Sequence, residues 1–173
     1  EAGLTFDIEG EGADEVPRDE THLLYRAMDA TFDLLGERPT GLHLTCRNTI
    51  PHGRGLGSSA AAIAAGVFLA RALTSDGHLL LDDEALFRLA TDLEGHPDNV
   101  APALAGGFTI SWIDGALAQS LRLQVDAEVT VFVPPEPVAT EIARGLLPET
   151  VPHADAAFSS GRAALLVAAL VCA

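Results

Sequence analysis

The chain has 173 residues, of which 48% are hydrophobic, and its 25 acidic against 10 basic side chains give a formal net charge of -15 at pH 7. This length and composition predict a folded protein with one ordinary core and exclude a disordered chain. A field of this sign repels nucleic acid and anionic membrane surfaces, so we expect neither as a partner. Any anionic ligand must therefore be held by local donors.

The two cysteines, Cys46 and Cys172, show no metal-binding spacing, which favours free thiols and a cytoplasmic location. The apolar tail that starts at Ala163 is shorter than a helix that spans a bilayer. The chain begins without Met in a strand-like segment and stops at Ala173 within an apolar helical pattern, so we expect a fragment of a longer fold. The sequence leaves open whether the protein forms a homodimer.

Residue patterns predict strands and helices in the first half of the chain. Leu4, Phe6 and Ile8 alternate with polar residues, as in a half-buried strand. An apolar stripe at helical spacing follows, and Gly36 and Pro39 end it. In chain order we expect a strand at 4–9, a helix at 20–35, a strand at 41–47, a helix from Ser58 and a helix at 83–93.

The second half continues this mixture. FTISW (108–112), LRLQV (121–125) and VTVFVPP (129–135) are candidate strands, and helices are expected at 138–147 and from Ala156. The strands and helices do not follow the spacing of regular βαβ units. The predicted class is therefore α+β or an irregular α/β fold.

A glycine-rich segment, IPHGRGLGSSAA (50–61), leads into the helix that starts at Ser58. Glycines let backbone N–H groups turn towards a ligand, and a helix N-terminus adds unpaired donors and a partial positive charge. Taken alone, the segment is either a phosphate-binding loop or a turn that lets the helix pack closely on a strand. A Walker-type loop is excluded because lysine is absent, and a dinucleotide fingerprint is disfavoured because the residues after the helix, TSDGHLLLDDE, lack the required second strand.

The pattern Pro-x-x-x-Gly-Leu-Gly-Ser-Ser-Ala, at 51–60, resembles the ATP-phosphate loop of the GHMP superfamily of small-molecule kinases. The resemblance implies that the loop wraps the triphosphate of ATP and that Ser58 or Ser59 helps to hold Mg²⁺. Arg54 either reaches a phosphate or points to solvent. The residues assigned to ATP in this way are Pro51, Gly53, Arg54, Gly55, Leu56, Gly57, Ser58, Ser59 and Ala60.

A second motif narrows the resemblance to the homoserine kinases. Residues 94–108, EGHPDNVAPALAGGF, look like the signature of that family, whose His-x-Asp-Asn cluster faces the amino-acid substrate. The resemblance implies that Glu94 binds Mg²⁺ and that His96, Asp98 and Asn99 contact homoserine. Considered without the resemblance, Glu94 is more typical of a solvated charge at a helix end, and Asp98 of an N-cap.

A third segment, TEIARGLLP (140–148), is similar to the stretch in which that family binds the homoserine carboxylate. The resemblance assigns substrate binding to Thr140 and Arg144. A planar guanidinium suits a carboxylate because it makes two parallel hydrogen bonds. The alternative role of Arg144 is an ion pair with Glu141 on the same helix.

Together the motifs imply ATP-dependent phosphorylation of the L-homoserine hydroxyl, on the route to threonine, with Asp98 and Asn99 as catalytic residues. Because no residue is an obvious general base, we expect alignment and electrostatics to supply most of the rate. Two alternatives stay open. One is another GHMP kinase that acts on a mevalonate-type or sugar substrate, and the other is a catalytically silent fragment.

The fold implied by the resemblance is α+β. We expect a GHMP kinase N-terminal domain, of the ribosomal protein S5 domain 2 type, at 1–124, and the beginning of a ferredoxin-like C-terminal domain at 125–173. The first strand of that family would precede Glu1, and most of its second domain would follow Ala173, so we expect the chain alone to be inactive. Residues 22–25 stand where that family approaches adenine, and the base contact stays open because their sequence, HLLY, differs.

Overall fold

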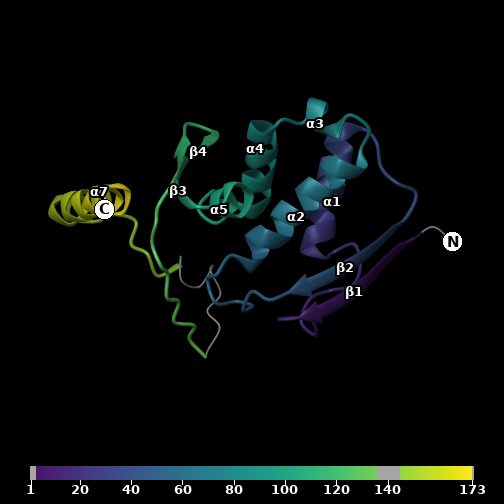
Figure 1. Ribbon diagram of the computed structural model, residues 1–173, viewed down its shortest axis with the longest axis horizontal. Helices are drawn as coiled ribbons and strands as arrows, with labels where there is room; N and C mark the ends of the chain where they lie inside the picture. Colours follow the sequence, from purple (N-terminus) through teal and green to yellow (C-terminus); the bar gives the residue numbers. More distant parts are fainter. Residues whose placement is uncertain (1–2, 136–144, 173) are drawn as a thin grey trace.

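The computed structural model describes residues 3–135 and 145–172. Its first three elements form a parallel βαβ unit: strand β1 (Leu4–Gly10), helix α1 (Leu23–Leu35) and strand β2 (Leu42–Asn48). The two strands pair along their whole length, and α1 packs over one face of them (Figure 1). The two expected strands and the expected helix are confirmed, and the parallel crossover is a feature that their irregular spacing did not predict.

Helix α2 (Ser58–Leu73) follows β2 after the glycine-rich loop and packs along α1. The two helices approach closely at Gly66, where a β-carbon would lie 2.4 Å from the carbonyl oxygen of Leu24 and 2.7 Å from the β-carbon of Ala27. A larger residue would push the helices apart, so this glycine is a packing requirement. The contact sets the position of α2, and therefore of its N-terminus, relative to the β1–β2 sheet.

Three helices then return the chain to the start of α2. Helix α3 (Gly77–Leu80) is one turn within the segment TSDGHLLLDDE, which contains no strand, and α4 (Asp83–Glu94) matches the expected helix. The side chain of Asp82 caps α4 by accepting a hydrogen bond from the N–H of Ala85 at 2.8 Å. Helix α5 (Val100–Ala105) follows. The His-x-Asp-Asn cluster therefore lies in the turn between α4 and α5.

Strands β3 (Phe108–Asp114) and β4 (Leu117–Leu123) form an antiparallel hairpin beside α5 (Figure 1) and confirm two expected strands. The third, at 129–135, is wrong. These residues form no strand because no neighbouring strand pairs with them, and the side chain of Phe132 is 90% exposed. Most of the helix expected at 138–147 lies outside the described residues.

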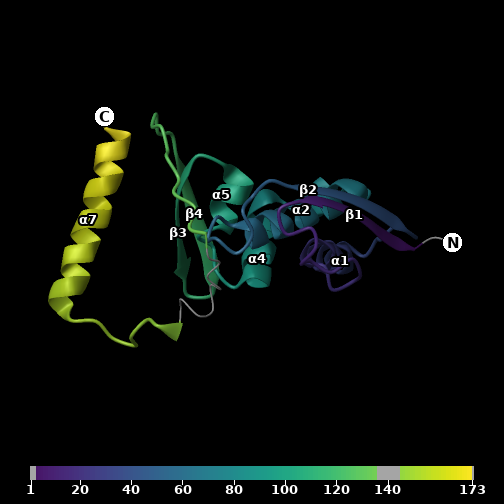
Figure 2. The same cartoon turned by 90° about the horizontal axis from the view of Figure 1, so that it is seen from below.

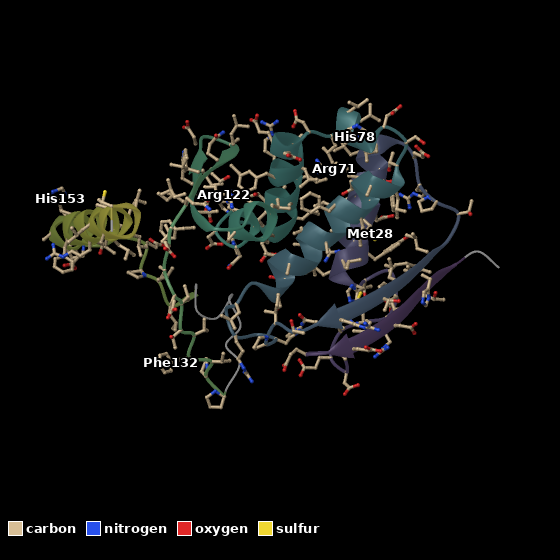
Figure 3. The ribbon with its side chains drawn as sticks, viewed as in Figure 1. Met28, Arg71, His78, Arg122, Phe132 and His153 are labelled. Carbon is tan, nitrogen blue, oxygen red and sulfur yellow. The ribbon has the colours of Figure 1, made fainter. Side chains whose placement is uncertain are left out.

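The hydrophobic core has two clusters. In the smaller one, α1 packs on β2, and the fully buried Met28 lies between the helices and the sheet (Figure 3). The larger one joins the helices to one another and includes Ala60 at the start of α2. Both clusters include residues of α1 and α2, so the loop before α2 leads directly into the hydrophobic core. The buried members of the larger cluster are Ala27, Ala60, Ile63, Val67, Leu81, Leu86, Phe87, Ala90, Val100, Ala101 and Ala118.

Helix α7 (His153–Val171) lies apart from the other elements (Figure 2), and none of its residues is buried. It confirms the helix expected from Ala156. The apolar tail expected from Ala163 is part of this longer helix, which by length and composition could cross a membrane, although one such helix is weak evidence for a membrane span. The expected domain boundary after residue 124 stays a prediction, and β4 ends just before it, at Leu123.

Candidate active site

The loop between β2 and α2 contains three glycines in the left-handed conformation. The φ angles of Gly53, Gly55 and Gly57 are 66°, 71° and 78°, values that other residues rarely adopt. Gly57 is the N-cap of α2, and its carbonyl accepts the hydrogen bond from the N–H of Ala61. Since an α-helix leaves its first N–H groups without an intrahelical partner, the start of α2 offers donors to an anion.

A hydrogen bond joins this loop to the end of α4. The hydroxyl of Ser59 donates to Oε1 of Glu94 at 2.6 Å. Ser59 is in the first turn of α2 and Glu94 is the last residue of α4, so the packing of these two helices brings together two motifs that lie far apart in the sequence. Of the two candidate serines, Ser59 is the one whose hydroxyl reaches the carboxylate.

The pair of Ser59 and Glu94 fits the chemistry of Mg²⁺. This ion prefers a carboxylate together with other oxygen ligands, and it keeps several waters or phosphate oxygens. A carboxylate oxygen and a hydroxyl oxygen at the end of the glycine-rich loop supply part of such a donor set. In the described part of the chain, no group of three His, Cys, Asp or Glu side chains is placed to hold a metal ion.

The turn between α4 and α5 places its polar cluster against the same loop. A β-carbon on Gly57 would lie 3.3 Å from the side-chain oxygen of Asn99, so the amide lies beside the loop at this glycine. The carboxylate of Asp98 accepts a hydrogen bond from the backbone N–H of Asn99 at 2.9 Å and shares a short one with Nδ1 of His96. The His96 side chain is 17% exposed and that of Asp98 is 61% exposed. The carboxylate is thus ordered by its neighbours and accessible from solvent.

A cavity of about 570 Å³ opens beside the loop, between β2 and the starts of α1 and α2. Ser58 and Ser59 line it on the side of the loop. Segment 11–21, which connects β1 to α1, covers it with Glu11 and Pro17 among others. The volume is in the range of small-molecule sites. The sequence patterns did not predict this cavity, because it depends on how the connecting segment folds back over β2.

His22 lines the cavity at the N-terminal end of α1. Its Nδ1 accepts a hydrogen bond from the N–H of Leu24 at 3.2 Å, and its ring stacks on Phe6 with 4.8 Å between centroids. Burial lowers the pKa of His22 below its ordinary value. Because Nδ1 is an acceptor, the neutral ring carries its proton on Nε2.

Asn48 is a positioning residue that the sequence analysis missed. Its side-chain amide donates to the carbonyls of Glu11 and Ile50 at 3.0 and 3.1 Å, and its side-chain oxygen accepts from the N–H of Ile50 at 3.0 Å. Asn48 therefore ties the entry of the phosphate loop to the segment that covers the cavity. An Asn at the end of a strand and before a loop rich in Gly and Pro is a signal for such a turn.

The structure also describes two further predicted site residues, Ala60 and Arg54. Ala60 is fully buried, so only its backbone could face a phosphate. The Nη1 nitrogen of Arg54 is buried and has no hydrogen-bond partner among the described residues. The Arg54 side chain is otherwise partly exposed, and its role stays a prediction. Thr140 and Arg144 lie outside the described residues.

A glycine loop that opens a helix and is met there by a carboxylate has the architecture of the ATP-binding half of a small-molecule kinase. Residues 22–107 match the model of the GHMP kinases N terminal domain. The chain belongs to the GHMP kinase family.

The relatives agree with one another. Homoserine kinases of Streptomyces coelicolor and Streptomyces avermitilis are 57% and 58% identical over 98% of this chain. The crystal structure of a homoserine kinase from Cytophaga hutchinsonii matches 99% of it with a TM-score of 0.75 at 27% identity. The chain spans 56% of the length of each of these three proteins. The recognition of the homoserine kinase type within the GHMP family, and the α+β fold that it implies, are confirmed.

Proposed function

We propose that the whole protein transfers the γ-phosphate of ATP to the hydroxyl of L-homoserine and forms O-phospho-L-homoserine, on the route to threonine. The observation that carries the proposal is the hydrogen bond of 2.6 Å between Ser59 and Glu94. It joins the phosphate loop to the motif that most resembles the homoserine kinases. The relatives of that name, matched over 98% of this chain, support the same substrate.

The phosphate loop and the start of α2 bind the triphosphate in this proposal. Backbone N–H groups of the loop and of the first turn of α2 donate to phosphate oxygens, which the left-handed glycines permit. Glu94 and Ser59 hold Mg²⁺, which when bound neutralises charge on the β- and γ-phosphates. We place the adenosine in the cavity of about 570 Å³, which begins at Ser58 and Ser59.

The cluster in the α4–α5 turn holds the acceptor. Asp98 and Asn99 bind the hydroxyl and the amine of homoserine, and His96 assists at its carboxylate. The contact between Asn99 and Gly57 supports this assignment, because it puts the cluster next to the loop that holds the transferring phosphate. Thr140 and Arg144 complete the carboxylate site. Alignment of the hydroxyl with the γ-phosphate then supplies most of the rate.

We place the enzyme in the cytoplasm, without nucleic acid or membrane as partners. Both cysteines are free thiols, Cys46 half-buried and Cys172 exposed. Free thiols are typical of a reducing compartment. The net charge of -15 opposes binding to nucleic acid and to anionic lipid.

The test is an ADP-release assay with homoserine, mevalonate and galactose in parallel. The chain spans 56% of the length of the Streptomyces coelicolor relative. We therefore define the completed kinase as this chain joined to the flanking segments of that relative. That relative is the positive control, and the chain by itself is assayed beside it. ADP release with homoserine alone supports the proposal. Release with mevalonate or galactose instead, or with none of the three, refutes it.

A further inference from the structure

The chain must bind a triphosphate without any lysine. Its 10 basic side chains are all arginines, against 25 acidic ones. Most of the described arginines are already occupied by protein groups. Arg18, Arg38, Arg47, Arg71, Arg88 and Arg122 donate hydrogen bonds to carbonyl or carboxylate oxygens, and Arg162 lies over the ring of Phe158.

Arg54 differs from these arginines. It lies in the phosphate loop between Gly53 and Gly55, which are both left-handed. Its Nη1 nitrogen is buried and has no hydrogen-bond partner among the described residues. A buried cationic donor without an acceptor costs free energy, and such groups in proteins are normally paired. The unpaired nitrogen therefore points to an anionic ligand at the loop.

The surroundings of the loop indicate which part of the nucleotide is involved. Arg54 does not line the cavity of about 570 Å³, whereas Ser58 and His52 of the same segment do. The guanidinium is thus not among the side chains that line the space assigned to adenosine. The loop also contacts Asn99 of the acceptor cluster through Gly57. A cation in this loop is therefore placed at the end of the nucleotide where phosphate is transferred.

We propose that Arg54 is a catalytic residue whose guanidinium binds the phosphoryl group of ATP during its transfer, and this inference rests on the kinase function proposed above. In the transfer, the bond from the γ-phosphorus to the oxygen that bridges to the β-phosphate breaks, and its electron pair leaves with ADP. A bond forms from the acceptor hydroxyl oxygen to the phosphorus, and the hydroxyl proton is released to solvent. Charge then spreads over three phosphoryl oxygens, which a planar guanidinium can bind in pairs.

The test compares Arg54→Gln and Arg54→Lys with wild type in the completed kinase. Arg88→Gln is the control for the loss of one positive charge, because Arg88 pairs with Glu84 on the surface of α4. We measure kcat, the affinity for MgADP, and the affinity for MgADP with tetrafluoroaluminate and homoserine, which mimics the transferring phosphoryl group. Thermal melts report whether each variant is folded.

For Arg54→Gln we expect kcat to fall by about 10³-fold, as for other arginines that stabilise phosphoryl transfer. The tetrafluoroaluminate complex should weaken in parallel, while the affinity for MgADP changes by less than about threefold because ADP lacks the transferred group. Arg54→Lys should lie between wild type and Arg54→Gln, since it keeps the charge but loses the paired donors. Arg88→Gln should match wild type.

Two results would overturn the proposal. One is a kcat for Arg54→Gln close to that of wild type. The other is an equal loss of affinity for MgADP and for the tetrafluoroaluminate complex, because Arg54 would then bind only the ground-state nucleotide. If the unsubstituted completed kinase did not turn over homoserine, the proposed function would fail. The affinity for MgADP, compared with that for MgADP with tetrafluoroaluminate in the absence of homoserine, would still test Arg54.

Discussion

The side-chain oxygen of Asn99 lies 3.3 Å from the point that a β-carbon on Gly57 would occupy. The glycine-rich loop and the α4–α5 turn therefore meet at a glycine that cannot be enlarged without displacing the amide. Gly57 also has a φ of 78°. We expect Gly57→Ala to cost about 1–2 kcal/mol of unfolding free energy from the left-handed backbone, plus the cost of moving Asn99. Urea unfolding of the chain measures the sum.

Gly55→Ala is the matched control for this prediction. Gly55 has a φ of 71°, but no atom lies within 4 Å of its added β-carbon. Gly55→Ala should therefore lose only the unfolding free energy that comes from the left-handed backbone. It should also lower the affinity for MgATP less than Gly57→Ala does. Combining Gly57→Ala with Asn99→Ala should recover about 0.5 kcal/mol or more, because the two sites are coupled. Strict additivity would contradict the contact.

The bond between Ser59 and Glu94 predicts how the completed kinase depends on Mg²⁺. Glu94→Gln keeps an acceptor for the Ser59 hydroxyl but removes the charge. We expect the Mg²⁺ concentration for half-maximal activity to rise by about tenfold or more, since each 1.4 kcal/mol of lost binding is tenfold in affinity. The measurement is a Mg²⁺ titration at saturating ATP.

Two controls accompany the Mg²⁺ titration. One tests whether the loss of a carboxylate elsewhere on α4 has the same effect, and the other compares the two serines. Glu84→Gln makes the same chemical change at the exposed pair with Arg88, and it should leave the titration unchanged. Ser59→Ala should shift the titration more than Ser58→Ala, because Ser59 is the serine that contacts Glu94. Equal shifts for the two serines would argue against the assignment of Ser59.

The stability of the chain should depend on pH through His22. Burial lowers its pKa in the folded state. As the pH falls below the unfolded value of about 6.5, the unfolded chain takes up the proton first, so the free energy of unfolding decreases until the lowered folded pKa is passed. His22→Asn retains a side-chain acceptor for the cap and removes the titration, so it should flatten this part of the pH profile.

Urea unfolding between about pH 7.5 and pH 5 covers the window in which this loss begins. His78→Asn is the control, because it removes an exposed histidine that does not line the cavity. A His22→Asn profile as steep as that of wild type would show that the decrease comes from other groups.

Sequence patterns predict the elements that need only local information. The alternation around Phe6 and the apolar stripe of α1 suffice for a strand and a helix, and the motif at 51–60 suffices for a glycine-rich loop that leads into a helix. The strand expected at 129–135 fails because a strand needs a partner, which the local pattern cannot supply. In the same way, the bond between Ser59 and Glu94 depends on the packing of α2 and α4.

The cavity, too, could not be predicted from local sequence patterns. Its cover, segment 11–21, is held in place by the side chain of Asn48, which reaches the carbonyl of Glu11 across 37 positions of sequence. The close approach of α1 and α2 at Gly66, where a β-carbon would lie 2.4 Å from the carbonyl oxygen of Leu24, is a second relationship of this kind. Neither relationship follows from residue patterns, because each depends on atoms that meet only in the folded chain.

Asp98 distinguishes alignment from general-base catalysis. Its carboxylate accepts from the N–H of Asn99 and pairs with His96, so part of its role is to order the turn. In the completed kinase we expect Asp98→Asn to raise KM for homoserine and to lower kcat by much less than about 10⁴-fold. A loss of that size with little change in KM, together with loss of the basic limb in a pH–rate profile, would identify a general base instead.

Arg144 offers the most direct test of the amino-acid substrate. A lysine in its place keeps the charge but loses one of two parallel hydrogen bonds to a carboxylate. Because a hydrogen bond between charged groups contributes about 1.5–3 kcal/mol, Arg144→Lys should raise KM for homoserine by about 10- to 100-fold and leave KM for ATP nearly unchanged. Arg162→Lys is the control, since Arg162 lies over the ring of Phe158 on α7. Equal increases in both KM values would show that Arg144 supports the fold or the nucleotide site, and the substrate carboxylate would then need another partner.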